Sequence, residues 1–99
     1  MSDYVVSEKA RIDLQLIWEY IAQNSAEAAD KVQNDFQSAM RRLAWMPGMG
    51  HTRSDVTSQH YRFWRVYSYL IIYKPDSKPL QIVRVIHGAR DLRNLLRHE

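Results

Sequence analysis

The sequence predicts an α+β fold in which an antiparallel helical hairpin packs on a mainly antiparallel sheet. Two long segments in the first half carry apolar residues at helical spacing. A short β-rich run precedes them, and three further β-rich runs separated by turn residues follow. Ninety-nine residues fit one domain, so we assign residues 1–99 to a single domain that ends in a short helix.

The composition excludes several classes of protein. The sequence has no cysteine, which removes disulfide scaffolds, thiolate zinc sites and a cysteine nucleophile. Its N-terminus has no apolar core of signal-peptide length, and no apolar run approaches the ~20 residues that span a membrane. We therefore expect a soluble, cytoplasmic protein. The net charge of +3 and the pI near 9.4 favour an acidic partner, but they fall short of the excess typical of proteins whose main task is to hold phosphates.

The first predicted helix presents more apolar surface than one docking face requires. Residues 3–7 form a short β-rich run, and Ser7 is a good N-cap for a helix over residues 8–24. One apolar row consists of Ala10, Leu14, Ile17, Trp18 and Ile21. A second row consists of Ile12, Leu16 and Tyr20, spaced four residues apart. Ordinary packing favours a helix held between another helix and the sheet; the alternative is that the second row forms an apolar groove for a partner peptide.

A second helix is predicted after the sequence "NSAE" at residues 24–27. Asn24 is its expected N-cap, and Glu27 three residues later gives a capping-box arrangement. The apolar face of this helix comprises Ala29, Val32, Phe36, Met40 and Leu43. Pro47 and Gly48 end it, and the short connection makes the two helices antiparallel. A loop over residues 47–60 follows, and its length is compatible with a function or with simple mobility.

Residues 61–67, 69–74 and 80–87 predict a three-stranded meander, with a tight hairpin at Ser68 and turn residues at 75–79. The last of these strands is apolar on both faces. We expect Leu80, Ile82 and Ile86 on one face and Val83 and Val85 on the other. Such a strand belongs in the centre of a sheet with a layer covering each face.

The C-terminal segment predicts a short helix that covers the far face of the sheet. Leu92, Leu95 and Leu96 are its apolar residues, and Arg90, Arg93 and Arg97 point outward. A helix of about two turns is too short to cover a whole sheet face. We therefore expect the sheet to keep apolar surface that its own helices leave uncovered, and such surface marks a binding site.

Four stretches carry motifs in a set order along nearly the whole sequence. They are "YVVSEKARIDLQLIWEYIA" at residues 4–22, "RLAWMPGMG" at 42–50, "LIIY" at 70–73 and "IVRVIHGARDL" at 82–92. The most specific is the His-Gly-Ala-Arg-Asp run that follows an arginine-containing strand. Together they resemble the RelE/ParE superfamily of bacterial toxins from type II toxin–antitoxin systems, and within it the ParE branch.

The resemblance implies a compact toxin that a cognate, ParD-like antitoxin holds inactive by wrapping its C-terminal region across the helical hairpin and the sheet. Characterised ParE toxins poison DNA gyrase, so the resemblance implies a gyrase inhibitor that acts by binding, with a part in plasmid stabilisation. No cofactor, membrane or sequence-specific nucleic-acid contact is expected. Two alternatives stay open: a ribosome-dependent mRNA endonuclease, as in RelE relatives, and an inactive member of the superfamily that only binds antitoxin.

RNA cleavage of the RelE type needs proton-transfer groups and cations for the developing phosphate charge. The resemblance places such groups at four positions, and this sequence keeps one. The loop before the meander offers Arg53 and no lysine, and Leu70 stands where RelE-type toxins carry arginine. The C-terminal segment has leucines in place of tyrosine, and only Arg90 matches. We therefore expect a binding toxin rather than an enzyme, and we assign no catalytic residue.

The four histidines do not predict a metal site. His51, His60, His87 and His98 show no metal-ligand spacing, and no carboxylate is in register with a pair of them. For His87, at the end of the last strand, a hydrogen-bonded structural role is favoured over that of a general base.

The candidates for contact with the antitoxin or the target are basic and aromatic: Arg62, Trp64, Arg65, Arg84, His87, Arg90 and Arg93. Arg62 and Trp64 share one face of the first meander strand and Arg65 lies on the other, and arginine with tryptophan recurs at interface hot spots. Arg90 also has a local interpretation, as the partner of a nearby carboxylate or carbonyl, while Asp91 stabilises the dipole of the last helix.

Overall fold

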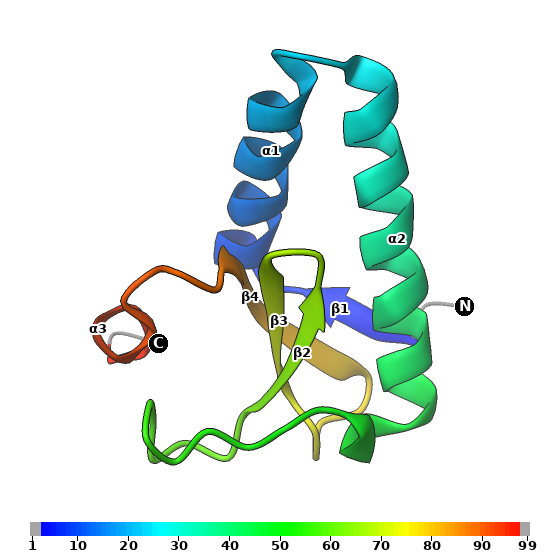
Figure 1. Cartoon of the computed structure of the whole chain (residues 1–99). Helices are drawn as coiled ribbons and strands as arrows, with labels where there is room; N and C mark the ends of the chain where they lie inside the picture. Colours follow the sequence, from blue (N-terminus) through cyan, green and yellow to red (C-terminus); the bar gives the residue numbers. More distant parts are fainter. Residues whose placement is uncertain (1–2, 98–99) are drawn as a thin grey trace.

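A computed structural model describes residues 3–97 and shows an α+β fold with a helical hairpin above a four-stranded sheet (Figure 1). The elements in order are β1 (Tyr4–Val6), α1 (Glu8–Ala22), α2 (Ala26–Trp45), the 3₁₀ turn η1 (Pro47–Met49), β2 (Arg62–Val66), β3 (Tyr69–Lys74), β4 (Leu80–His87) and α3 (Leu92–Leu96). The sheet order is β1-β4-β3-β2. Because β1 is parallel to β4 and the other pairs are antiparallel, the sheet is mixed. The predicted fold class is confirmed.

The two long helices begin at serine caps. Ser7 caps α1 as predicted, and its hydroxyl accepts a hydrogen bond from the Ala10 amide at 3.0 Å. The predicted cap of α2 is wrong: Ser25, and not Asn24, has the extended backbone of an N-cap and accepts from the Ala28 amide at 3.1 Å. Asn24 instead lies in the turn that follows α1, where its amide donates to the Ile21 carbonyl.

The edge of β4 is completed partly by β1 and partly by α1. β1 pairs only with residues 80–82 of β4. Beyond this point the Ser7 hydroxyl donates to the Val83 carbonyl at 2.8 Å, and the Asp13 carboxylate accepts from the Val85 amide at 3.0 Å. Asp13 also receives two bonds from the Arg84 guanidinium, at 2.7 and 2.9 Å. The first turns of α1 are therefore fixed against the strand where β1 has ended.

A β-bulge in β4 changes which side chains share a face. Ile72 pairs with Arg84 and Tyr73 pairs with Ile82, so Val83 is an extra residue in β4. Strict alternation holds up to Ile82 and is then shifted by one residue. Consequently Leu80, Ile82 and Val85 face the helical hairpin, whereas Val83 and Ile86 face α3. The predicted grouping of Ile86 with Leu80 and Ile82, and of Val83 with Val85, is wrong for this reason.

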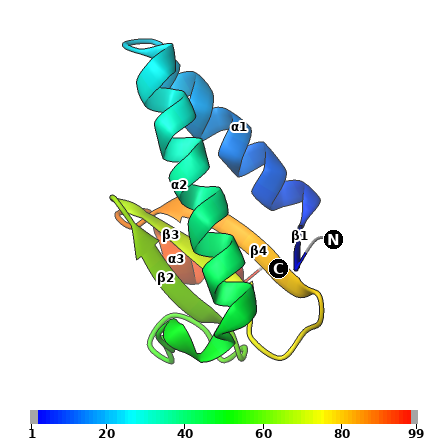
Figure 2. The same ribbon diagram turned by 90° about the vertical axis from the view of Figure 1, so that its right-hand side faces the viewer.

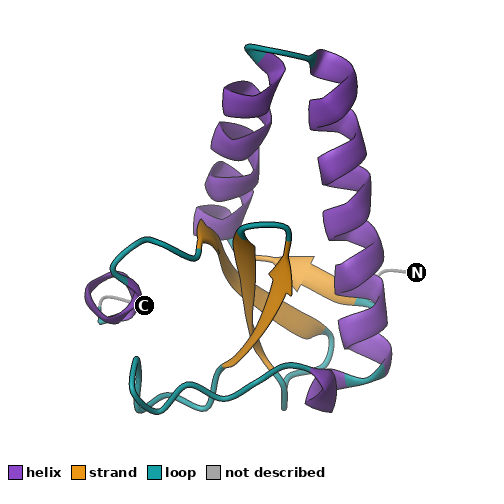
Figure 3. Ribbon diagram, viewed as in Figure 1, coloured by secondary structure: helices purple, strands orange, loops and turns teal. Residues whose placement is uncertain are grey.

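Both faces of the sheet are largely covered by the protein itself. On one face the helical hairpin packs over the sheet (Figure 2), and Phe36, Met40 and Leu43 are fully buried there. On the other face α3 buries Leu92 and Leu96 against the sheet, as predicted, and Val56 of the loop before β2 adds to this core (Figure 3). The cover ends at β1, where Val5 is 43% exposed and lines a hollow of about 330 Å³. The prediction that the sheet keeps uncovered apolar surface is therefore confirmed at this edge and wrong for the rest of the sheet.

We expect the Asp13→Asn substitution to lower the free energy of unfolding by about 3 kcal/mol, because it removes the negative charge that the largely buried Arg84 guanidinium bonds. The two side chains are only 15% and 11% exposed, so solvent screens the pair weakly. Urea denaturation measures the change. The matched control is Asp76→Asn, which neutralises an exposed carboxylate in the turn between β3 and β4 and should change stability by less than about 0.5 kcal/mol. Equal effects of the two substitutions would contradict the importance of this contact.

Candidate partner-binding site

The outer side of α1 carries a row of large apolar side chains in solvent. Ile12, Leu16 and Tyr20, here called the α1 row, are 51%, 59% and 68% exposed. Ala10 and Ile17 on the other side of the helix are buried in the core. α1 does pack against both α2 and β4, as the first interpretation expects, but this packing covers only one of its two apolar rows.

Beside the α1 row lies a hollow of about 450 Å³, here called the α1 hollow. Its walls are α1, the turn between β2 and β3, the end of β4 and Arg90. Leu16 and Tyr20 line it from the helix, and His87 and Arg90 line it from the opposite side. The structure thus brings together two groups of predicted site residues, one apolar and one basic, that are about 70 residues apart in the sequence.

The turn between β2 and β3 is held against α2 by a polar cluster. Tyr67 has a φ of 57°, a conformation that a tyrosine rarely adopts, in a two-residue turn with Ser68. Its hydroxyl donates to the Asp35 carboxylate, and Lys31 donates at 3.3 Å both to Asp35 and to the Tyr67 oxygen. The hydrogen bond from Tyr67, followed by that from Lys31, lowers the pKa of Asp35, and the bond with Tyr67 contributes most to raising the pKa of Lys31. This contact fixes one wall of the α1 hollow.

Sequence reasoning missed this cluster. The sequence predicts Tyr67 as the last residue of a strand, and no local pattern relates it to Lys31 and Asp35 of α2. The available signal was the short connection between the two strands, because a two-residue hairpin turn requires a positive φ at its first central residue, here Tyr67.

Aromatic rings form the floor of the same region. Tyr69 meets Phe36 and His87 in edge-to-face contacts, with ring centroids 5.7 and 5.5 Å apart. Burial raises the pKa of Tyr69. The Nδ1 atom of His87 accepts a hydrogen bond from the Ala89 amide at 3.1 Å, so in the neutral ring Nε2 carries the proton and faces outward as a donor. The hydrogen-bonded role predicted for His87 agrees with this geometry.

The other predicted contact residues lie elsewhere. Arg84 is engaged with Asp13, and Arg62 donates to the Gly50 carbonyl at 2.6 Å. Trp64 packs against the core beneath the helical hairpin, and Arg65 is exposed on the opposite side of β2. Arg93 donates at 2.6 and 3.2 Å to the Asp55 carbonyl in the loop before β2. Asp91 is the N-cap of α3, as its predicted position at the helix start requires.

A second exposed apolar group lies away from the α1 row. Trp45 and Met46, at the end of α2, are 82% and 55% exposed. Neither residue is among the predicted contacts, although both fall inside one of the four motifs. Trp45 borders a hollow of about 470 Å³ formed with the turn before β4.

Residues 3–97 offer neither a metal site nor a helix that could span a membrane. No group of three or more histidine, aspartate and glutamate side chains there could hold a metal ion. His98 lies outside the described residues. Within the same range, no helix is long and apolar enough to cross a bilayer.

Comparison with known proteins identifies the family. A family model described as "ParE toxin of type II toxin-antitoxin system, parDE" matches residues 4–92. The chain belongs to the ParE toxin family. Toxin ParE1 of Caulobacter vibrioides is similar, with 29% identity over 94 residues that make up 94% of this chain and 96% of that relative. A solved chain titled "Chromosomal ParDE TA system from P. aeruginosa" has the same fold, with a TM-score of 0.70 and 21% identity over 85% of this chain and 92% of that one.

The structure also locates the position at which RelE-type toxins would carry an arginine. Leu70 is 7% exposed and packs in the core beneath α3, away from the α1 hollow. Arg53, the single cation of the preceding loop, forms a two-bond contact with Asp55, at 3.0 Å for each bond. Of the three positions compared with RelE-type catalytic groups (Arg53, Leu70 and Arg90), only Arg90 is an exposed cation at the α1 hollow of this ParE family member.

We expect the Tyr67→Phe substitution to raise the pKa of Asp35 toward its ordinary value of 3.8, because the tyrosine is the largest cause of its lowering. A folded-state pKa below the unfolded value stabilises the protein above the unfolded pKa, and this contribution disappears as the pH falls through the folded pKa. In wild type the contact is therefore fully present above about pH 4 and lost in stronger acid. NMR titration of the Asp35 carboxyl measures both proteins. An unchanged pKa in the variant would contradict the contact.

Proposed function

We propose that this ParE family member is a cytoplasmic toxin that inhibits DNA gyrase by binding it and that a cognate, ParD-like antitoxin neutralises it. The observation that carries the proposal is the α1 row, three large apolar side chains exposed beside a hollow with a basic rim. Such a surface on a small protein is typical of a site that another polypeptide covers.

The antitoxin is proposed to place an amphipathic segment on the α1 row. Three side chains spaced four residues apart extend over about 12 Å of helix, the length over which a partner helix presents an apolar face. Tyr20 is the most exposed of the three and has the amphipathic ring common at interface hot spots. His87 and Arg90 on the opposite side of the hollow favour an acidic residue next to the apolar contacts of the partner.

DNA gyrase is proposed as the target because the family is the ParE family and because the nuclease alternative lacks support from the site. Ribosome-dependent cleavage needs several convergent cations and a proton donor or acceptor. Around the α1 hollow the structure supplies Arg90 and His87, while Leu70 is buried elsewhere and Arg53 is bound to Asp55. These positions favour inhibition by binding over catalysis.

The test is to measure the purified chain in two assays side by side. We expect loss of supercoiling by DNA gyrase together with accumulation of cleaved DNA, and we expect no cleavage of mRNA on the ribosome. The reverse pattern would replace the proposal with an endonuclease. Activity in neither assay, with antitoxin binding retained, would indicate an inactive member of the family.

The antitoxin contact is tested in the same gyrase assay by titrating the antitoxin. We expect Tyr20→Ala to weaken binding of the antitoxin by about thirtyfold, the loss of about 2 kcal/mol typical of a hot-spot residue, so that more antitoxin is needed to restore supercoiling. Because Tyr20 is exposed, the fold should not change. The matched control is Trp45→Ala, an exposed aromatic residue distant from the α1 hollow. Loss of neutralisation in the control alone would place the antitoxin at the end of α2.

A further inference from the structure

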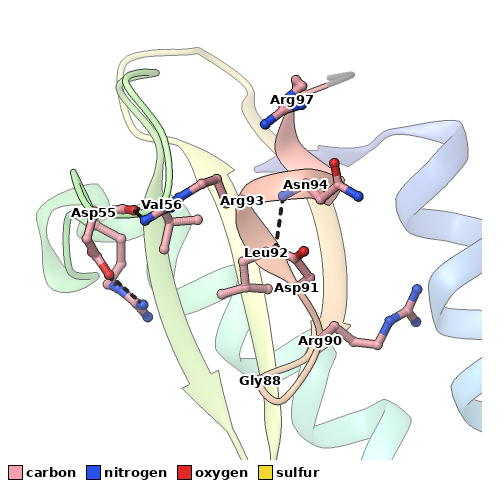
Figure 4. Close-up of a pocket in the computed structure, with 10 residues that line it drawn as sticks. Asp55, Val56, Gly88, Arg90, Asp91, Leu92, Arg93, Asn94 and Arg97 are labelled. Atoms are coloured by element: carbon pink, nitrogen blue, oxygen red, sulfur yellow. Dashed lines mark hydrogen bonds and ion pairs between the residues drawn. The ribbon is translucent and has the colours of Figure 1, made fainter.

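A second hollow, of about 370 Å³, lies between α3 and the loop that precedes β2 (Figure 4). Four arginines line it: Arg53, Arg90, Arg93 and Arg97. Two carboxylates, Asp55 and Asp91, are the acidic residues of its lining. We call it the basic pocket. It is distinct from the α1 hollow, although Arg90 stands between the two and borders both.

The net charge of the protein is modest, but its positive and negative residues are unevenly distributed along the sequence. Residues 36–99 hold 11 of the 14 lysines and arginines and only four of the 11 aspartates and glutamates. The excess of positive charge therefore belongs to the second half of α2, the meander, its loops and α3, and the basic pocket lies within this part. A local concentration of one sign attracts a polyanion even where the total charge is small.

One wall of the basic pocket is fixed before any ligand arrives. The Asp55 carboxylate accepts two bonds from Arg53, and the Asp55 carbonyl accepts two bonds from Arg93, so a single residue ties the loop to α3. The contact with Arg53 lowers the pKa of Asp55, which keeps this carboxylate charged and bound. Arg93 uses two of its nitrogens in this way and keeps further donors for a ligand.

Two arginines remain for a ligand. Arg90 and Arg97 are exposed, and neither guanidinium has a hydrogen-bond or ion-pair partner among residues 3–97. Figure 4 shows Arg97 at the far end of α3 and Arg90 before its start; the Arg93 side chain extends toward Asp55, whereas that of Arg90 extends to the other side, toward α1. Arg93 and Arg97 are four residues apart and lie about 6 Å apart along the helix axis. Cations placed in sequence along one element suit a ligand with repeated negative charges.

We propose that the basic pocket binds the phosphodiester backbone of a nucleic acid without reading its sequence. Guanidinium groups bind phosphates through two parallel hydrogen bonds, and all the cations here are arginines. An acidic peptide fits less well, because Val56 and Leu92 are the apolar residues of the lining and Leu92 is buried, which leaves no pocket for an apolar anchor. This inference goes beyond the proposed function, since inhibition of gyrase through protein contacts alone needs no phosphate site.

The test is fluorescence anisotropy of the full chain with a labelled 20-base-pair DNA duplex and with a 20-nucleotide RNA, in a series of salt concentrations and without gyrase. We expect the affinity to fall with salt and to be the same for two duplexes of unrelated sequence. The double substitution Arg90→Gln and Arg97→Gln should weaken duplex binding on the order of tenfold at low salt and reduce the slope of log affinity against log salt by about 2. Each single substitution should reduce this slope by about half as much as the double substitution does.

The matched control is the double substitution Arg41→Gln and Arg42→Gln on α2, which removes the same charge from exposed arginines outside the basic pocket. It should leave the slope nearly unchanged. Equal losses in both double variants, or no binding of either nucleic acid at 50 mM salt, would overturn the proposal. Binding of a polyglutamate peptide that depends on Arg90 and Arg97, with no binding of nucleic acid, would assign the pocket to an acidic protein instead. Because gyrase is absent, failure here leaves the proposed target untouched, and thermal melting confirms that each variant is folded.

Discussion

The edge of β4 needs hydrogen-bond partners beyond the point where β1 ends, and α1 supplies them. Ser7 begins the helix and bonds the strand, and Asp13 closes the contact by accepting from the Val85 amide and from two nitrogens of the Arg84 guanidinium. A β-bulge at Val83 lies at the same place. This contact determines the rotation of α1 about its own axis. It therefore determines which of its two apolar rows is buried and which is left in solvent.

The rotation of α1 decides which apolar side chains the molecule presents to solvent. With Ala10 and Ile17 inward, the α1 row faces outward next to the turn that Tyr67 fixes to α2. Around the end of β4 the surface changes from apolar to basic, and Arg90 borders both hollows. One small domain thus presents an apolar surface suited to a protein partner and a basic surface suited to phosphates, supported by the same strand.

The sequence predicted most of the fold because its local signals agree with one another. Helical spacing, the Ser7 cap and the turn residues predict the element order. The first helix has more apolar residues than one packed face needs, which points to the exposed row at Ile12, Leu16 and Tyr20. Three features could not be predicted, because each depends on contacts between distant residues. The bulge at Val83 reversed the faces of the second half of β4, α3 with the loop covered most of the far face of the sheet, and Tyr67 joined a turn to α2. The role of Arg84 could not be predicted for the same reason. An arginine in a strand suggested an interface residue, whereas its partner in the structure, Asp13, is 71 residues away in the sequence.

The most direct test of the central claim is hydroxyl-radical footprinting of the toxin alone and bound to its antitoxin. The method reports the exposure of individual side chains, and the protein carries an internal comparison, since Leu16 and Tyr20 are about as exposed as Met46 and less than Trp45. The account predicts strong protection of Leu16 and Tyr20 by the antitoxin and unchanged labelling of Trp45 and Met46. Protection of Trp45 and Met46, with the α1 row still fully reactive, would contradict it.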